Sequence, residues 1–408
     1  MSQPARHPVS RRSLLTGSAL TVGGALAGAA ATAAATGGST GEPSTTSTVD
    51  LGAQAVPFHG PHQAGIETPA QAHAVFLALD LTAGVDRPAL VRLMRLLTDD
   101  AARLTQGTAP LADGQPELAH VPARLTVTFG FGPRLFDAAG LAAQRPASLQ
   151  PLPPFGIDKL QDRWSGGDLL IQICADDPVT VAHAQRMLVK DSRAFATVRW
   201  LQRGFRRGRG MQDDGATQRN VLGQLDGTGN PAPGSAVFAG AVWTDDGPAW
   251  LHGGTTLVVR RIRAELEAWD AADTVGKEFA VGRRLTDGAP LTGQRETDPP
   301  DFAARNALGF PVISEFSHVA RAHVAGDRQR IFRRPYNYDE PPGPDGTADS
   351  GLIFAAYQRD IAAQFLPIQR NLAEADLLNE WITSIGSAVF AVPPGCEPGG
   401  WIGQGLLG

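Results

Sequence analysis

Apolar residues in the first half of the chain alternate between the periods of strands and helices. His73–Leu81 is rich in β-forming residues and predicts a strand. The apolar positions after it recur at helical spacing: Leu90, Val91, Leu93, Met94, Leu97, Ala101 and Leu104. The chain then predicts strands over Leu125–Phe131, Asp168–Ala175 and Val198–Phe205, with a helix over Pro178–Val189. This β-α-β, long loop, β-α-β order is that of the split ferredoxin-like unit.

The second half repeats this order more loosely. Thr255–Ile262 predicts a strand that leads into an acidic helix, and Leu352–Gln358 predicts a second strand. Ala375–Ile385 is expected to be a helix, followed by a closing strand over Ser387–Val392. No sequence identity links the halves, so the duplication is inferred from element order alone. We expect an α+β fold of duplicated ferredoxin-like domains with antiparallel sheets. The first domain would span residues 57–212 and the second residues 213–408. The boundary between them is expected in the charged, Gly-rich stretch near 208–219.

Residues 1–35 have the pattern of a twin-arginine signal peptide. Arg11 and Arg12 precede a mildly apolar Ala/Gly/Thr/Leu stretch, and small residues at Ala31–Ala35 suit a peptidase. The stretch is too rich in Gly and Thr to favour a stable membrane anchor. Residues 36–56 predict a flexible linker. We therefore expect export by the twin-arginine translocase to an extracellular or periplasmic location, a route that carries folded proteins and so suits a cofactor inserted in the cytoplasm.

Composition narrows the possible partners and metal sites. The 408 residues carry a formal net charge of -5. The predicted signal peptide contains arginines but no acidic residues, so its removal makes the net charge of the chain more negative. A nucleic-acid partner is therefore disfavoured. The only cysteines, Cys174 and Cys396, are too few for a cluster of thiolate ligands, and the sequence leaves open whether they form a disulfide.

The stretch Asn220–Asn230, NVLGQLDGTGN, contains a compact acidic motif. Gly223 and Gly227 flank Asp226 at a spacing that lets the backbone pass close to a flat ligand and direct one carboxylate toward it. A simple turn closed by an aspartate explains the same residues. The motif alone therefore leaves both interpretations open.

Other segments identify a family. The chain resembles the dye-decolourising peroxidases, in particular their twin-arginine-exported branch, from about Phe58 to Gly395. The resemblance is carried by PFHGPHQAGIETPAQAHAVFLALDL, LTVTFGFGPRLFD, GGDLLIQICADD, SHVARAH, IFRRPYNY, GLIFAAYQRD and LPIQRNLAEADLLNEWITSIGSAVFAVPPG. It implies that haem b (iron protoporphyrin IX) lies between the sheet and the helices of the second domain.

The resemblance also implies how the iron is held. His318 falls at the position of the family's iron ligand, and His323 is its competitor. A ligating histidine normally donates its other nitrogen to a carboxylate or carbonyl. Glu380 is the preferred candidate for that role and Asp376 the alternative.

On the opposite side of the haem, the resemblance assigns proton transfer to Asp226. Peroxide must lose a proton from one oxygen and gain one at the other for its O–O bond to break heterolytically. Arg333 is the expected partner that stabilises negative charge, with Arg334 as the alternative. Phe354, next to Ile353, is expected to line the pocket, and Arg283 to lie at the haem edge.

The sequence thus predicts a secreted haem b peroxidase that uses hydrogen peroxide to oxidise dyes, phenols or similar aromatic donors. The alternative is a haem-binding, iron-acquisition protein of the deferrochelatase type, which would need neither Asp226 nor Arg333. A binding module without a cofactor would leave the export signal unexplained. The sequence leaves the oligomeric state open.

Overall fold

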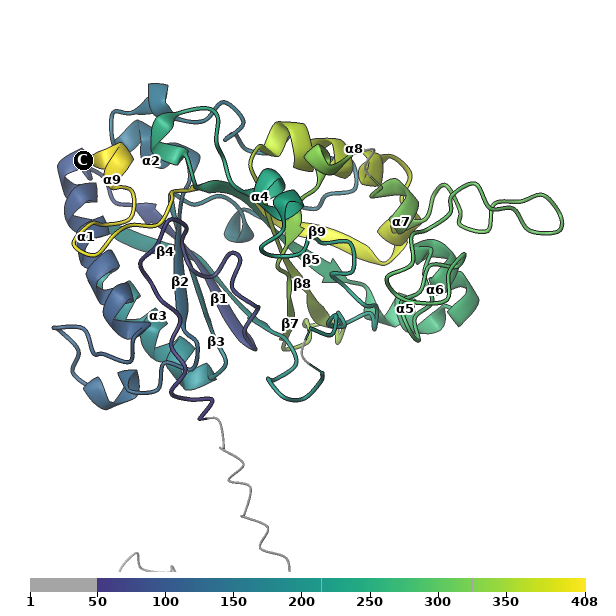
Figure 1. Cartoon of the computed structure of the whole chain (residues 1–408), viewed down its shortest axis with the longest axis horizontal. Coiled ribbons are helices and arrows are strands. Elements are labelled where there is room, and N and C mark those ends of the chain that lie inside the picture. The colour runs from purple at the N-terminus through teal and green to yellow at the C-terminus, as the bar shows by residue number, and fades with distance from the viewer. Residues whose placement is uncertain (1–49, 214, 324–325) are drawn as a thin grey trace, which may run out of the picture. The chain divides into compact units, whose positions relative to one another are not determined.

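The two halves of the chain each build a four-stranded antiparallel sheet with the same strand order. In this computed structural model, residues 50–408 are described except 214 and 324–325, so the predicted signal peptide and most of the linker lie outside the described residues. Asp50–Gly408 forms one compact unit (Figure 1). The predicted division into residues 57–212 and 213–408 remains a prediction.

The first half follows its predicted elements closely. Its sheet has the order β2-β3-β1-β4. The elements are β1 (His73–Leu81), α1 (Arg87–Leu104), β2 (Thr126–Phe131), β3 (Leu169–Ala175), α3 (Pro178–Ser192) and β4 (Ala196–Phe205). Asp86 and Asp177 cap the two helices, because their carboxylates accept the backbone N–H groups of Ala89 and Thr180 at 2.9 and 2.7 Å.

The second half has the equivalent order β9-β5-β8-β7. Its strands are β5 (Thr255–Ala264), β6 (Phe332–Arg333), β7 (Tyr336–Glu340), β8 (Asp349–Gln358) and β9 (Ile382–Val392). β6 pairs with β8 on the same edge as β7. The two sheets join through the pairs Phe131–Ala391 and Phe205–Asn337, which closes a barrel. The predicted α+β fold with duplicated ferredoxin-like order is confirmed.

Short helices fill the connections. They are η2 (Pro116–Ala119), α2 (Pro133–Ala138), η3 (Ala142–Gln144), η4 (Asp162–Trp164), α4 (Ala236–Val242), η5 (Ala249–Leu251), α5 (Leu266–Ala271), α6 (Thr274–Val281), α7 (His318–Arg321), η6 (Asp327–Gln329), the π-helix η7 (Ile361–Phe365), α8 (Leu366–Ala375), η8 (Leu377–Glu380) and α9 (Gln404–Leu407). None of the helices within residues 50–408 is long and apolar enough to span a membrane.

One predicted helix is wrong. The helix expected over Ala375–Ile385 is replaced by α8, which ends at Ala375, and by the single turn η8. Asp376 causes the break, because its backbone is extended and its side chain accepts the N–H of Leu378 at 2.9 Å. The closing strand consequently starts at Ile382 instead of Ser387.

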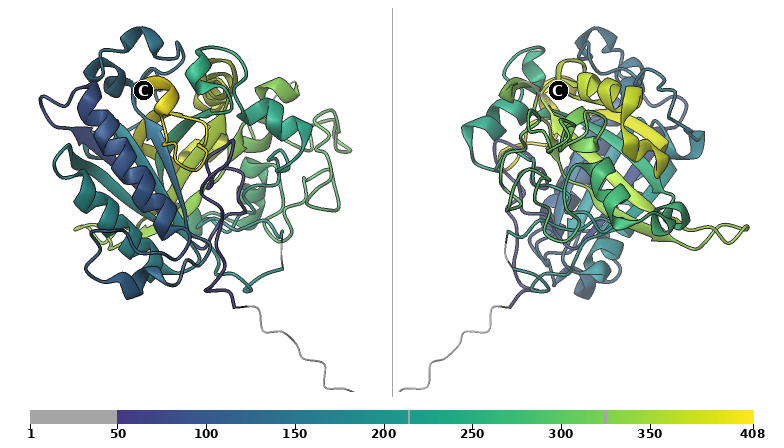
Figure 2. Two further views of the ribbon diagram at one scale, coloured as in Figure 1. Left: turned by 60° about the vertical axis from the view of Figure 1, so that its left-hand side comes forward. Right: turned by 90° about the vertical axis from the view of Figure 1, so that its right-hand side faces the viewer.

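The helices of the two halves meet their sheets differently. In the first half, nine residues of α1 are buried and seven of α3. In the second half, α7 and α8 have no buried residue, although Leu366, Ile368 and Leu372 of α8 are apolar. Figures 1 and 2 show α7 and α8 on the side of the molecule away from α1. In the second half, α8 therefore has half-buried apolar side chains, whereas α1 and α3 of the first half contribute to a closed core.

Candidate active site

Asp226 lies on one arm of a tight turn, whose two short arms are hydrogen-bonded to each other. Its backbone N–H donates to the carbonyl of Gln218 at 2.8 Å, and that of Asn220 donates to Gln224 at 2.9 Å. Gly223 has φ +79° and Gly227 has φ +140°, conformations that side chains rarely adopt. No atom lies within 4 Å of where a Cβ of Gly223 would stand, so its backbone conformation explains this glycine and crowding does not.

Arg333, at the end of β6, contacts the side chain of Asp226. The Nη1 of Arg333 donates to Oδ1 of Asp226 at 3.1 Å, and both side chains are largely buried. Asn230 fixes the arginine backbone: its Nδ2 donates to the carbonyl of Arg333 at 2.7 Å, and its Oδ1 accepts the Arg333 N–H at 3.1 Å. The motif stretch therefore supplies both the carboxylate and the amide that holds its partner.

The neighbouring arginine points elsewhere. Arg334 is buried, and its guanidinium donates to the carbonyl of Thr68 and to the side chain of Gln71. Successive residues of a strand face opposite sides of a sheet, which separates the two arginines. Of the two candidates, Arg333 is the one that contacts Asp226.

His318 begins α7 and bonds to a carboxylate. Its Nδ1 lies 2.6 Å from Oδ2 of Asp376. An ionised carboxylate can only accept, so Nδ1 carries a proton, and in the neutral imidazole Nε2 keeps its lone pair. The competitor, His323, is exposed and packs against Phe302 with 4.9 Å between ring centroids.

The preference for Glu380 as the partner of His318 is wrong. Glu380 ends the η8 turn and is exposed, whereas Asp376, the alternative, is buried and bonds to the imidazole. The expected helix over Ala375–Ile385 would have placed the two acids one turn apart on one face, where neither is distinguished from the other. The break at Asp376 removes that arrangement.

The His318 pair lies within electrostatic range of the Asp226 pair. Burial by itself would lower the pKa of His318, but the charge of Asp376 and its hydrogen bond outweigh this and raise that pKa above its ordinary value. The charges of Arg333 and Asp226 also act on His318. The two bonded pairs therefore lie near one another, although they come from distant parts of the sequence.

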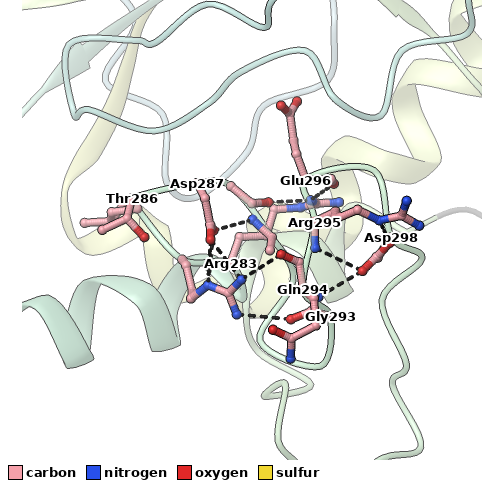
Figure 3. Close-up of polar contacts among 12 residues, drawn as sticks. Arg283, Thr286, Asp287, Gly293, Gln294, Arg295, Glu296 and Asp298 are labelled. Carbon is pink, nitrogen blue, oxygen red and sulfur yellow. Dashed lines mark hydrogen bonds and ion pairs between the residues drawn. The ribbon is translucent and has the colours of Figure 1, made fainter.

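Arg283 is held by the loop that follows α6. Its Nη1 donates to the carbonyls of Gly288 and Glu296 at 2.7 and 2.8 Å (Figure 3). Burial lowers the pKa of Arg283, and the charge of Arg333 lowers it further, while Glu296 opposes both. This arginine thus lies close enough to Arg333 to sense its charge.

Phe354 lies on the same face of β8 as Ala356, the register partner of Arg333. It packs at 6.2 Å from Phe365, measured between ring centroids. Ile353 faces the other way, into the barrel interior with Tyr336 and Tyr338. Of the two residues considered for the pocket wall, only Phe354 shares the Arg333 side of the sheet.

The residues fit a haem. A flat, largely apolar group with carboxylates needs an apolar slot, one axial base and nearby cations. The half-buried apolar residues of α8, the lone pair on Nε2 of His318, and Arg283 and Arg333 supply these. Residues 50–408, outside the gaps, contain no cluster of three His, Cys, Asp or Glu side chains able to hold a metal by themselves.

Several supporting residues escaped the sequence analysis. Asn230 belongs to the motif stretch, and an amide beside a glycine-rich turn was its only signal. Glu296, which accepts hydrogen bonds from Thr217 and Thr228, had no signal because it lies 68 residues from Thr228 in an irregular loop.

Cys174 is buried in β3, Cys396 is half-buried, and both are free thiols.

Comparison with known proteins identifies the family. A family model described as "Dyp-type peroxidase, N-terminal" matches residues 63–206, and one described as "Dyp-type peroxidase, C-terminal" matches residues 217–397. The chain is 38% identical over 422 residues to a dye-decolorizing peroxidase of Thermobifida fusca, covering 98% of both chains. It is 36% identical to a deferrochelatase of Yersinia pestis, covering 98% of this chain and 95% of that one.

A solved structure agrees. The crystal structure of a DyP-type peroxidase from Cellulomonas bogoriensis is 51% identical and superposes with a TM-score of 0.85, covering 88% of this chain and 99% of that chain. Both halves of the chain, and almost its whole length, match members of one family. The chain belongs to the Dyp-type peroxidase family.

Proposed function

We propose that the protein is an exported haem b peroxidase that uses hydrogen peroxide to oxidise aromatic donors such as phenols and dyes. The observation that carries this proposal is the Asp226–Arg333 ion pair, whose charges act on the His318 of the His318–Asp376 pair. An axial base alone suffices to hold haem. A carboxylate that can accept and return a proton, paired with an arginine that stabilises negative charge, is suited to breaking a peroxide bond.

Each residue has a defined part in this reaction. Bound haem supplies the iron centre that accepts the peroxide and its oxidising equivalents. Nε2 of His318 would hold the iron, and Asp376 makes the imidazole more electron-rich by accepting from Nδ1. Arg283 and the half-buried face of α8 would hold the edge and plane of the haem.

Asp226 moves the proton. Its carboxylate would take the proton from one oxygen of hydrogen peroxide and return it to the other oxygen, which would leave as water while bound haem supplies the electrons for breaking the O–O bond. Arg333 donates to the negative charge that develops during this transfer. Because Arg333 already bonds to Asp226, it also fixes the direction of the carboxylate.

The deciding experiment is a peroxide titration of the haem-loaded protein. We expect a Soret band that shifts on addition of one equivalent of peroxide and returns when a phenol is added, with the phenol oxidised. A spectrum that ignores peroxide would contradict the proposal.

The deferrochelatase relatives favour a second candidate, in which the protein removes iron from haem and releases the porphyrin. Both candidates use His318 and the same slot. The same titration separates them, because iron-free porphyrin has its own fluorescence, which oxidation of a phenol does not produce. Accumulation of that fluorescence with no oxidised phenol would favour the second candidate.

We also propose export through the twin-arginine translocase. The support is the Arg11–Arg12 pair with its mildly apolar stretch. The pair is an address that a receptor reads, and lysine keeps only its charge. Replacing both arginines by lysine should leave folded, haem-loaded protein in the cytoplasm, and undiminished export of that variant would contradict the signal assignment.

A further inference from the structure

The turn that carries Asp226 is closed at its open end by a residue from another loop. The backbone bond from Asp226 to Gln218 is the last rung between the two arms. Thr217 precedes that rung on one arm and Thr228 follows it on the other. Both threonine hydroxyls donate to one oxygen, Oε1 of Glu296, at 2.5 and 2.7 Å.

Glu296 is itself held in place. Its carbonyl accepts from Arg283 at 2.8 Å, and the N–H groups of the two residues before it donate to Asp298 at 2.9 and 3.0 Å. Figure 3 shows the side chain of Glu296 extending away from the Arg283 guanidinium. The loop therefore presents this carboxylate to the Asp226 turn and does not use it for its own closure.

The same loop begins against the histidine helix. Gly282 has φ +86°, and a Cβ there would lie 2.4 Å from Cγ1 of Val319 and 2.9 Å from Oγ of Ser317, the residues on either side of His318. Only a residue without a side chain allows this close approach. Residues 282–298 thus touch the His318 helix at one end and the Asp226 turn at the other.

We infer that Glu296 is a positioning residue for Asp226. By bonding to both arms, its carboxylate sets where the Asp226 carboxylate stands relative to Arg333 and to the space that His318 faces. The inference rests on the proposed role of Asp226 in proton transfer. A shift of about 1 Å in such a group can cost about 10²-fold in rate, so partial loss of the anchor should cost about tenfold.

The test uses the haem-loaded full-length protein and two measurements. One is the second-order rate constant for the reaction with peroxide. The other is the dissociation constant of cyanide, because hydrogen cyanide must also lose its proton before it binds iron. Glu296→Ala should lower the rate constant about tenfold and weaken cyanide binding. Glu296→Gln, whose amide oxygen still accepts from the threonines, should recover most of both.

Substitutions of Thr228 provide an independent test if Glu296→Ala fails to fold. Thr228→Val removes one anchoring hydroxyl and should slow the peroxide reaction severalfold, whereas Thr228→Ser keeps the hydroxyl and should behave as wild type. Asp287→Asn is the matched control, since this carboxylate belongs to the same loop but bonds to Arg284 and not to the Asp226 turn. Wild-type behaviour of Thr228→Val would overturn the inference.

A double variant shows whether Glu296 acts through Asp226. Asp226→Asn combined with Glu296→Ala should be no slower than Asp226→Asn alone, because the positioned group is already gone. A further tenfold loss in the double variant would overturn the positioning role. If Asp226→Asn itself reacts at the wild-type rate, the proposed function fails and this inference with it. If Asp226→Asn is slow while Glu296→Ala is normal, only this inference fails.

Discussion

The two halves of the barrel share a strand order but use the space above their sheets in opposite ways. In the first half, α1 buries Leu90, Leu93, Met94 and Leu97 completely, in a core that also contains residues of the sheet and of α3. Burial of each such side chain stabilises the fold by about 1.5–3 kcal/mol. In the second half, α8 has no buried residue, so that contribution is largely missing. The comparison teaches that the same strand order can be combined with a helix packed into the core in one half and with a half-buried helix beside the candidate site in the other.

Each half contains a histidine–aspartate pair. Substitution of the histidine in the second half should have the largest of the predicted effects, the loss of haem binding. His183 bonds to Asp113 at 2.8 Å with both side chains essentially inaccessible, whereas the side chain of His318 is 30% exposed. His318→Ala should abolish stable haem binding, seen as loss of the Soret band after gel filtration. His183→Gln should keep haem and lower only the melting temperature. Haem retention by the His318 variant would refute the ligand assignment.

The adjacent arginines should separate rate from stability. Arg333→Met removes the partner of Asp226 and should slow the peroxide reaction by about 10²–10³-fold with little change in unfolding. Arg334→Met leaves the carbonyl of Thr68 and the side chain of Gln71 without their buried donor, so it should cost about 1–3 kcal/mol of stability but leave the folded protein reactive. Stopped-flow absorption and urea unfolding of both variants check this, and a reversed pattern would exchange their roles.

Removal of haem should affect only one half. Without haem, the half-buried face of α8 meets water, so its backbone N–H groups should exchange with deuterium at least about tenfold faster. The N–H groups of α1 should be unchanged, because its core contacts do not involve the cofactor. Hydrogen exchange of the haem-free and haem-loaded proteins measures both helices together. Equal acceleration in α1 would contradict the division of roles between the halves.

The first half has a buried carboxyl, Asp100, which should make stability depend on pH. Burial, together with a hydrogen bond and charge repulsion from Asp191, raises the pKa of Asp100 to about 8, and Asp99 adds to this while Arg103 opposes it. The folded state therefore holds a proton that the unfolded chain releases above about pH 4. Stability should fall as pH rises from about 4 to 8.

Asp100→Asn should remove this dependence, because an amide cannot lose the proton. Relative to the variant, we expect the wild type to lose roughly 1–3 kcal/mol of unfolding free energy between pH 5 and pH 8. Urea unfolding at the two pH values measures the difference. Exposed Asp99→Asn, which removes only a minor cause of the shift, should keep most of the pH dependence, and parallel pH profiles for wild type and Asp100→Asn would contradict the raised pKa of Asp100.

The sequence predicted the regular parts of the fold better than the site. Strands β1 to β4 were placed within about two residues, because their apolar runs are long and bounded by turns. β6 and β7 were missed, since Pro335 interrupts them and Arg333 and Arg334 hide the alternation. His318, Asp226 and Arg333 came from resemblance to a family, and local pattern alone would not have selected them.

The errors have a physical cause in common. The sequence offered no local feature that separates Glu380 from Asp376, and the expected helix over Ala375–Ile385 does not form because the Asp376 side chain caps a single short turn. Glu296 was invisible because its partners are brought to it only by the folding of two irregular loops. Local periodicity carries no information about contacts between such loops.

The central claim is that Asp226 moves the proton in the second half's open site. Stopped-flow mixing of haem-loaded protein with peroxide, from acid to neutral pH, tests it most directly by comparing wild type with Asp226→Asn. We predict that the variant keeps the wild-type haem spectrum but reacts about 10²–10⁴-fold more slowly. An Asp226→Asn protein that reacts with peroxide at the wild-type rate throughout this pH range would contradict the account.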